Sequence, residues 1–529
     1  MSYRVWRGGI ARGARAAFTG AMNPVSVPVG PLSLEDVVAV ARHGRSVEVA
    51  PDALAAMAGS RAIIEALAHD ARPHYGISTG FGALATKHIP VERRLDLQRS
   101  LVRSHAASSG PEIEPEVVRA TMLLRLSTLA TGRTGARPEV ALTYAAMLNA
   151  GITPVIGEYG SLGCSGDLAP LAHIALAAMG EGPVRVGDEL GDAASALAAA
   201  GIAPVELREK EGLALINGTD GMLGMLCLAI ADLDRLLATA DIAAALSIEG
   251  LAGTDAVLAE DLQALRPHPG QAESAATMRA VLAGSHALAA HRDGFTRVQD
   301  AYSLRCAPQV HGAARDTVDH TRRVAERELA SAIDNPVVTL DGRVESNGNF
   351  HGAPVGYALD FLAIAVADVA SMSERRTDRF LDKARNGGLP PFLAHDPGVD
   401  SGHMIAQYTQ AGIVSELKRL AAPASVDSIP TSAMQEDHVS MGWSAARKLR
   451  RAIDGLTRVL AIELMTAARG IELRGTTPGP VGAAAIARIR EAVPPAGPDR
   501  FLAPDIARAV ALVESGDVLD ALALQEIPS

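Results

Sequence analysis

The sequence predicts a mainly α-helical protein. Alanine and leucine, which favour helices, are abundant among the 529 residues, and aromatic residues make up only 3%. Alternating β-branched residues, which are typical of half-buried strands, are scarce. Two stretches, residues 359–373 and 449–464, place apolar residues on one helix face over several turns. Stripes of this length indicate the core of a helical bundle.

Shorter helices are expected first along the chain. Ser33 is a suitable N-cap residue and is followed by the acidic Glu35 and Asp36, so a helix should begin at residue 34. Helical spacing of apolar residues then recurs in residues 34–41, 54–67, 91–104 and 115–130. The glycine-rich residues 75–82 interrupt this pattern and predict a loop.

Longer helices are expected in the second half. Their apolar stripes consist of Leu359, Leu362, Val366, Val369 and Ser373, and of Leu449, Ile453, Leu456, Leu460 and Leu464. The second of these helices should end near Gly470, because Pro478 and Pro480 follow it. We expect four parts: a disordered extension (1–30), an N-terminal domain (31–235), a central helical bundle (236–515) and a C-terminal tail (516–529).

Composition excludes several functional classes. The net charge of −11 disfavours nucleic acid or an anionic membrane surface as a partner. The three cysteines lack CxxC spacing, and the histidines lack HxxxH or HExxH spacing, so neither a disulfide framework nor a metal site is expected. No apolar run reaches transmembrane length. These features favour a cytoplasmic protein.

The most unusual stretch is residues 160–173, where small residues are concentrated before a helix-like run. In Cys164-Ser165-Gly166, the amide nitrogen of Gly166 can attack the carbonyl carbon of Cys164. Ring closure with loss of one water, and dehydration of Ser165 with loss of a second, would give an electrophilic methylidene-imidazolone. No ordinary side chain is a comparable electrophile. Ser-Gly-Asp alone would be an ordinary turn.

The whole stretch resembles the prosthetic-group loop of the histidine and aromatic amino-acid ammonia-lyases. The resemblance implies a 4-methylidene-imidazole-5-one group (MIO) formed autocatalytically from Cys164, Ser165 and Gly166, with no metal. The family most often has Ala at the position of Cys164, but the ring uses only main-chain atoms there. The resemblance also implies an L-aspartase/fumarase-like central helical bundle and a homotetramer whose active sites combine loops of neighbouring subunits.

Further motifs extend this resemblance from about residue 32 to residue 505. Residues 75–82 resemble the family loop that begins with the tyrosine thought to remove the β-proton, here Tyr75, although Ser78 replaces the commoner Asn. Residues 299–309 match the element in which Arg305 would hold the substrate carboxylate. By the same resemblance, four other residues lie by the electrophile or the amino acid: Gln299, Tyr302, Asn217 and Phe350. Asp220 departs from a frequent Gln and is assigned no role.

Substrate choice is expected to depend on Ser104-His105 and on Glu436, which match the corresponding motifs of the histidine ammonia-lyases. An imidazole ring offers one donor and one acceptor, which His105 and Glu436 can satisfy together. A phenyl ring would leave both groups unpaired, which discriminates by roughly 10⁴–10⁵. Taken singly, His105 is as well explained as a core histidine and Glu436 as a surface acid. Met434 replaces a common Asn in this loop.

The resemblance therefore implies a lyase that converts L-histidine to trans-urocanate and ammonia, the first step of histidine degradation. The amine would add to the methylidene carbon while Tyr75 takes the β-proton, and attack by the imidazole ring is the alternative left open. The rival enzyme functions are a tyrosine or phenylalanine ammonia-lyase and an aminomutase. A non-catalytic helical scaffold is the rival from another class, and it would not need Ser165, Tyr75 and Arg305.

Overall fold

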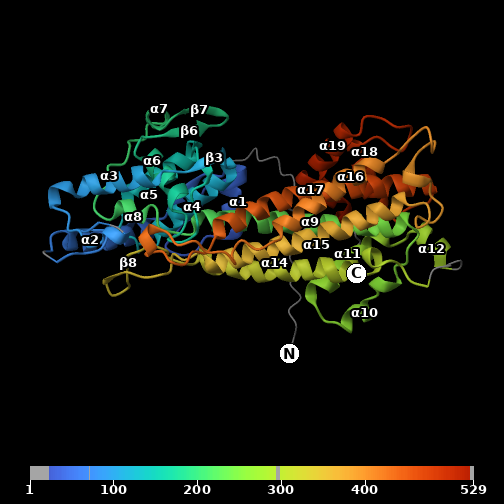
Figure 1. The fold of residues 1–529 in the computed structure, drawn as a ribbon, viewed down its shortest axis with the longest axis horizontal. Helices are drawn as coiled ribbons and strands as arrows, with labels where there is room; N and C mark the ends of the chain where they lie inside the picture. The colour runs from blue at the N-terminus through green and yellow to red at the C-terminus, as the bar shows by residue number, and fades with distance from the viewer. Residues whose placement is uncertain (1–22, 71, 81, 293–297, 525–529) are drawn as a thin grey trace.

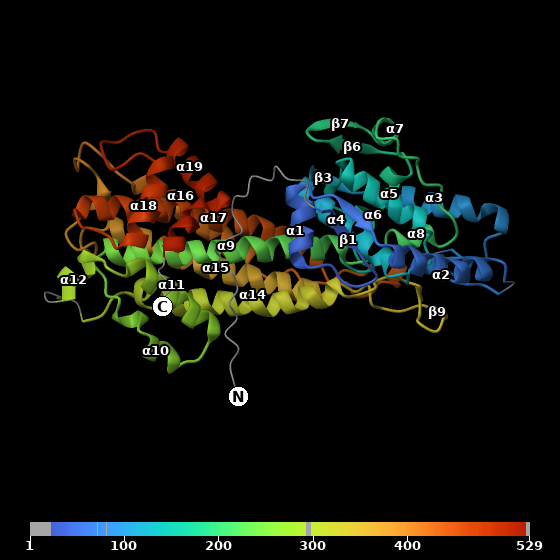
Figure 2. The same ribbon diagram turned by 180° about the vertical axis from the view of Figure 1, so that it is seen from behind.

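The computed structural model describes residues 23–524 except 71, 81 and 293–297. The predicted mainly α-helical architecture is confirmed. Shorter helices and strands form an N-terminal region at one end, and a bundle of long helices extends away from it (Figure 1). The view from behind shows the same division (Figure 2).

The N-terminal region is built largely of short helices that begin at prolines or capping residues. Ser33 caps the first of them, and the Ser33 and Asp36 side chains form a capping box with the backbone. Pro51, Pro115 and Pro138 occupy first helical positions, where a backbone N–H would have no hydrogen-bond partner within the helix. The helices are α1 (Leu34–His43), α2 (Pro51–Ala68), α3 (Arg94–His105), α4 (Pro115–Ala130), α5 (Pro138–Asn149), α6 (Leu168–Ala178), α7 (Ala193–Ala199) and α8 (Glu211–Ala214).

Short strands tie these helices together. β1 (Val25–Val27) pairs in parallel with β2 (Val47–Val49), so ordered structure begins inside the predicted extension. The disorder predicted for residues 1–30 is therefore wrong for this strand, and residues 1–22 lie outside the described residues. The antiparallel pairs join β3 (Ser109–Glu112) to β5 (Gly157–Tyr159), β4 (Ile152–Pro154) to β6 (Pro183–Val186), β6 to β7 (Glu189–Asp192), and β8 (Val337–Val338) to β9 (Val344–Glu345).

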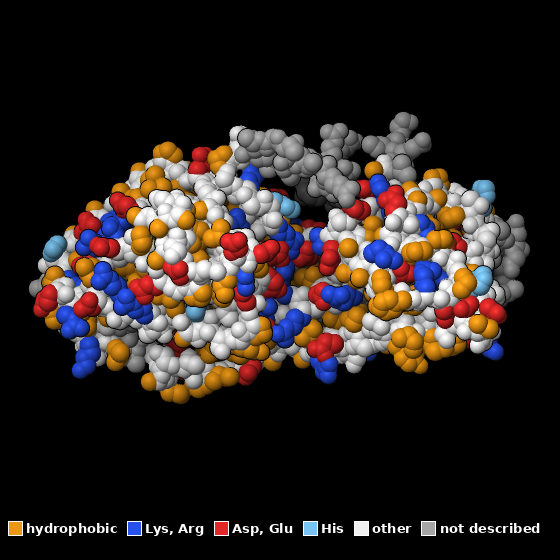
Figure 3. Space-filling view, turned by 90° about the horizontal axis from the view of Figure 1, so that it is seen from above, with side chains coloured by type: hydrophobic (Ala, Val, Ile, Leu, Met, Phe, Trp, Pro, Cys, Tyr) orange, Lys and Arg blue, Asp and Glu red, His pale blue; other side chains and the backbone are white. Residues whose placement is uncertain are grey.

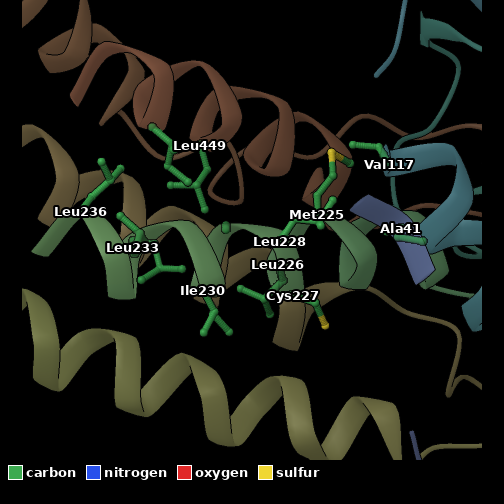
Figure 4. Close-up of a cluster of buried hydrophobic side chains, with 14 of the residues drawn as sticks. Ala41, Val117, Met225, Leu226, Cys227, Leu228, Ile230, Leu233, Leu236 and Leu449 are labelled. Carbon is green, nitrogen blue, oxygen red and sulfur yellow. The ribbon is translucent and has the colours of Figure 1, made fainter. Parts of the chain in front are cut away.

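Four long helices form the bundle: α9 (Asp220–Gly250), α14 (Ala307–Leu329), α15 (Ala353–Leu381) and α17 (Gly442–Arg474). Both predicted apolar stripes are buried. Figure 4 shows Leu233 and Leu236 of α9 near Leu449 of α17. α9 also runs across residue 235, where we expected a domain boundary, so the N-terminal region and the bundle share one continuous helix.

Further helices surround the far end of the bundle and its loops. They are α10 (Glu260–Ala264), α11 (Pro269–Leu282), α12 (His286–Arg292), α13 (Tyr302–Arg305), α16 (Met404–Leu420), α18 (Pro480–Ala492) and α19 (Ala503–Ser515), with the 3-10 turns η4 (Ala256–Leu258), η5 (Pro391–Leu393) and η7 (Asp517–Leu524). The 3-10 turns η2 (Gly82–Leu84) and η3 (Val91–Arg93) belong to the N-terminal region, and η6 (Ser432–Met434) contacts η2.

The end of α17 differs from the prediction. The helix continues past Gly470 to Arg474, and Gly475 caps it with a left-handed φ of 66°. Gly470 lies inside the helix, and a Cβ there would overlap the Phe380 ring. Close packing, rather than chain termination, explains this glycine.

One described helix, α15, is long and apolar enough to cross a membrane by length and composition. The expectation that no apolar run reaches transmembrane length is therefore wrong for this helix. In the structure, 61% of its most apolar window is buried within the protein, as expected for a core helix.

Ion pairs join the N-terminal region to the bundle. Arg42 of α1 lies 2.7 Å from carboxylate oxygens of both Glu116 and Asp232. Arg447 of α17 lies 2.5 Å from Glu114 at the start of α4. Charged side chains of both signs gather near the middle of the face in Figure 3. These partly buried pairs fix the orientation of the loops that α17 and α4 carry.

Candidate active site

The loop that contains Cys164-Ser165-Gly166 connects β5 to α6 and is held by the start of two bundle helices. The carbonyl oxygen of Gly163 accepts hydrogen bonds from Ser440 Oγ at 2.7 Å and from the Gly352 amide at 3.2 Å. The Met441 amide donates to the Leu162 carbonyl at 2.8 Å. The N-terminal ends of α15 and α17 therefore fix the loop from one side.

Gly166 lies against the backbone of Gly218, from the segment that precedes α9. Gly166 has a φ of 81°, and a Cβ there would lie 2.0 Å from the Gly218 carbonyl oxygen. The next amide, that of Asp167, donates to the same carbonyl at 2.7 Å. Only glycine fits this position, and it presents a backbone nitrogen unhindered by a side chain, as ring closure on Cys164 requires.

Asp167 is a further residue of this loop to which the sequence analysis gave no role. Its carboxylate accepts bonds from Ser161 Oγ at 2.8 Å and from the Met222 amide at 2.9 Å. Complete burial raises its pKa to about 7 despite these bonds. Asp167 thereby joins the loop to the first turn of α9. The Ser161-to-Asp167 spacing spans the loop, and only the folded structure shows that the two side chains meet.

Glu436 is the side chain that reaches the reactive tripeptide. Ser165 Oγ donates to Glu436 Oε1 at 2.8 Å, and Cys164 Sγ lies 3.4 Å from Oε2. Thr431 Oγ1 donates to Oε2 at 2.8 Å. Burial and the nearby Glu436 charge raise the pKa of the Cys164 thiol to about 12. The structure thus brings Cys164, Ser165 and Glu436 together.

His105 ends α3 close to this group. Its Nδ1 donates to the Leu101 carbonyl at 2.9 Å, which leaves Nε2 as an acceptor in the neutral ring. Burial lowers the pKa of His105, while the Leu101 carbonyl and the Glu436 charge oppose that shift. Ser104 is exposed, and its hydroxyl donates to the same carbonyl at 3.0 Å. His105 is therefore the residue of this pair that is available to a ligand.

Tyr75 and Phe350 lie on two loops beside this group. The Tyr75 hydroxyl accepts a bond from the Gly82 amide at 3.2 Å, and a Cβ on Gly82 would lie 3.2 Å from Ser432 Oγ. His351, which follows Phe350, stacks on His438 with ring centroids 5.5 Å apart. Both loops therefore contact the segment that carries Glu436.

Asn217 and Asp220 lie behind the tripeptide. Asn217 is buried, and its amide nitrogen donates to the Asn335 carbonyl at 3.3 Å. Asp220, which had no predicted role, forms a buried ion pair with Arg125. A Cβ on the intervening Gly218 would overlap the Arg125 guanidinium. The pair therefore supports the strand-like contact between Gly218 and Gly166.

Gln299, Tyr302 and Arg305 form a second group near the other end of the bundle. Arg376 of α15 donates to the Ser303 carbonyl within α13, whereas Gly352, at the start of α15, contacts the reactive loop. These two α15 positions are 24 residues apart, or roughly 36 Å at about 1.5 Å per residue. One chain therefore does not bring this group to Ser165.

The second group nevertheless has the properties of a carboxylate site. The Arg305 guanidinium lies 4.5 Å from the centroid of the Tyr302 ring. Its Nε is buried without a hydrogen-bond partner among the described residues. Tyr302 is 69% exposed and Gln299 is exposed. A cation with an unused buried donor suits an anionic ligand.

The chain matches a known family along most of its length. The family model described as aromatic amino acid lyase matches residues 32–491. A histidine ammonia-lyase of Streptomyces avermitilis is 65% identical over 503 residues, covering 94% of this chain and 98% of its own. The structure resembles a tyrosine aminomutase of Streptomyces globisporus (TM-score 0.90, 38% identity, 96% and 100% coverage) and a histidine ammonia-lyase of Trypanosoma cruzi (TM-score 0.87, 38% identity, 95% of each chain).

Proposed function

Because the chain belongs to the aromatic amino acid lyase family, we infer that it removes ammonia from L-histidine without oxidation and releases trans-urocanate. It is a carbon–nitrogen lyase. The observation that carries the choice of histidine is the position of Glu436, which accepts a hydrogen bond from Ser165 and whose charge opposes the lowering of the His105 pKa by burial. The Glu436 carboxylate and His105 Nε2 are both acceptors, so together they match the two N–H donors of a cationic substrate imidazole.

The electrophile is formed, in this proposal, from Cys164, Ser165 and Gly166. The Gly166 nitrogen bonds to the Cys164 carbonyl carbon and that oxygen leaves as water; Ser165 loses Oγ and its α-hydrogen as a second water. The required glycine at position 166 and the main-chain-only use of Cys164 fit this group. When formed, the MIO group supplies the electrophilic carbon that ordinary side chains lack.

The protein residues position the amino acid around that carbon. Arg305 pairs with the substrate carboxylate in a bidentate manner, and Tyr302 lies against its guanidinium. Tyr75 removes the β-proton, with its oxygen already held by the Gly82 amide. His105 and Glu436 fix the imidazole ring, so that the reacting groups meet in an attack-ready geometry.

A second copy of the chain completes the site in this proposal. The two groups of residues are roughly 36 Å apart along α15, far more than one amino acid spans. Arg305, Tyr302 and Gln299 must therefore come from a neighbouring subunit. A homotetramer with shared sites, which the motif resemblance implies, satisfies this requirement.

The direct test is incubation of the purified protein with L-histidine, L-tyrosine and L-phenylalanine in separate reactions. We expect near-ultraviolet absorbance of urocanate to appear with histidine, and little turnover of the other two. Release of cinnamate or coumarate, or formation of a β-amino acid, would instead identify an aromatic ammonia-lyase or an aminomutase. Absence of all these products would favour the non-catalytic scaffold.

The ring-binding residues give a second expected result. His105→Leu and Glu436→Gln should each lower kcat/KM for histidine, and together by about 10³-fold or more, because buried polar groups are left without partners. Activity toward tyrosine or phenylalanine should not fall in parallel. Steady-state kinetics on all three amino acids measures this. Histidine turnover that survives both changes would remove these residues from the pocket.

The base can be tested separately. Tyr75→Phe should fold normally and lower kcat by about 10²–10⁴-fold, since it removes only the hydroxyl that takes the proton. The same variant should keep the two-water mass deficit of the 164–166 peptide. Rates from urocanate absorbance, with intact mass as the control, check both. A near-normal kcat would exclude Tyr75 as the base.

A further inference from the structure

We propose that Thr431 is a positioning residue for Glu436, fixing one carboxylate oxygen so that the other faces the substrate imidazole, with Cys164 as a weaker support. The inference rests on the proposed function. It concerns two side chains to which the motif comparison assigned no role in substrate binding.

Backbone pairing places Thr431 and Glu436 opposite each other. The Thr431 amide donates to the Glu436 carbonyl at 2.9 Å, and the Glu436 amide donates back at 3.3 Å. The connecting turn η6 holds Ser432, Ala433 and Met434 at φ values of 52°, 53° and 70°. Left-handed conformations are unfavourable for residues that carry a Cβ, so the surrounding contacts must stabilise this turn. Such strain is typical of functional sites.

The Thr431 side chain adds to this pairing. Its hydroxyl donates to Glu436 Oε2 at 2.8 Å, and Cys164 Sγ is the second neighbour of that oxygen at 3.4 Å. Oε1 has one different neighbour, Ser165 Oγ, at 2.8 Å. The two sides of the carboxylate, Oε1 and Oε2, therefore have different partners.

Formation of the electrophile changes only one of these sides. When Ser165 loses Oγ as water, Oε1 loses its donor, whereas Thr431 and Cys164 remain on Oε2. Oε1 is then a free acceptor beside the position of the former serine side chain. An imidazole N–H is a suitable donor for it. Thr431 thus prevents the carboxylate from rotating when its serine partner is removed.

The turn η6 also contacts the loop of the proposed base. A Cβ on Gly82 would lie 3.2 Å from Ser432 Oγ, and the Gly82 amide donates to the Tyr75 hydroxyl. A displacement of the strained turn would therefore move both the imidazole acceptor and the Tyr75 loop. This contact connects ring binding to proton removal.

The test compares Thr431→Val, which keeps the shape but removes the hydroxyl, with Thr431→Ser, which keeps the donor. Thr431→Val should lower kcat/KM for histidine by about 10- to 100-fold, mainly by raising KM, because a hydrogen bond to a charged group is lost. The kcat/KM of Thr431→Ser should stay within about 3-fold of that of the unsubstituted protein. Cys164→Ala should lower kcat/KM less than Thr431→Val does, since a thiol is a weak donor. All three should keep the two-water mass deficit and the melting temperature.

The outcomes separate the inference from the function it rests on. If the unsubstituted protein does not convert histidine, the proposed function fails. If it does and Thr431→Val keeps its KM, the positioning role is wrong. Equal losses of kcat/KM in Thr431→Val and Thr431→Ser would also overturn the positioning role, since the serine variant keeps the hydroxyl. A missing mass deficit in Thr431→Val would overturn it as well, because Thr431 would then be needed for ring formation. A lower kcat at unchanged KM would indicate a merely structural effect.

Discussion

Ser165→Ala should abolish histidine turnover, lowering kcat by at least about 10³-fold, because alanine has no hydroxyl to lose and the electrophilic carbon cannot form. The hydrogen bond from Ser165 to Glu436 would also disappear. Intact mass should fall short of the encoded mass by at most one water in the 164–166 peptide, instead of two. Peptide mass and urocanate absorbance measure the two effects.

Cys164→Ala is the matched control at the neighbouring position. The ring uses only main-chain atoms of residue 164, so this variant should keep the full two-water deficit and most of its activity. If Ser165→Ala kept normal turnover, or if the active unsubstituted protein showed its full encoded mass, the proposed electrophile would be wrong.

Mixing two inactive variants should restore activity. Arg305→Ala is expected to lower kcat/KM by about 10²–10⁴-fold, because the substrate carboxylate loses its partner and the reacting groups lose their alignment. Ser165→Ala chains still carry Arg305, and Arg305→Ala chains still carry Ser165. If each site combines the two groups from different chains, random co-assembly should regenerate roughly a quarter of the sites. Co-expression of differently tagged variants, followed by purification through both tags, measures this.

The control uses two residues that one chain brings together. Ser165 and Glu436 are in direct contact within the described chain, so mixing Ser165→Ala with Glu436→Ala should restore nothing. Equal restoration of activity in the two mixtures would contradict a site that combines residues of two chains. Lack of rescue in verified Ser165→Ala and Arg305→Ala mixed assemblies would contradict it as well.

Local sequence rules predicted much of the fold. α1 begins directly after Ser33, and α4 spans the predicted 115–130, because capping and helical periodicity act over a few residues. The helix end predicted near Gly470 was wrong because this glycine makes room for the Phe380 ring, a contact between residues far apart in the sequence. The strand of residues 25–27 was missed because it is short and depends on a partner 22 residues away.

The same distinction applies to the site. The motifs identified Ser165, His105 and Glu436, and the structure places the three near one another. Thr431 and Asp167 were missed because their roles arise from contacts with Glu436 and Ser161 that no spacing rule encodes. The resemblance implied sites shared between subunits, but only the path of α15 shows how far Arg305 lies from Ser165 within one chain.

The position of Cys164 has a consequence for the durability of the protein. A thiolate is a strong nucleophile, and one placed next to an electrophilic carbon would quench it by addition. With its pKa raised to about 12 by burial and by Glu436, the thiol stays protonated near neutral pH. The same protection slows alkylating reagents and peroxide at this cysteine. In the proposed site, the chain can therefore carry a sulfur atom beside the electrophilic carbon without a thiolate that would add to it.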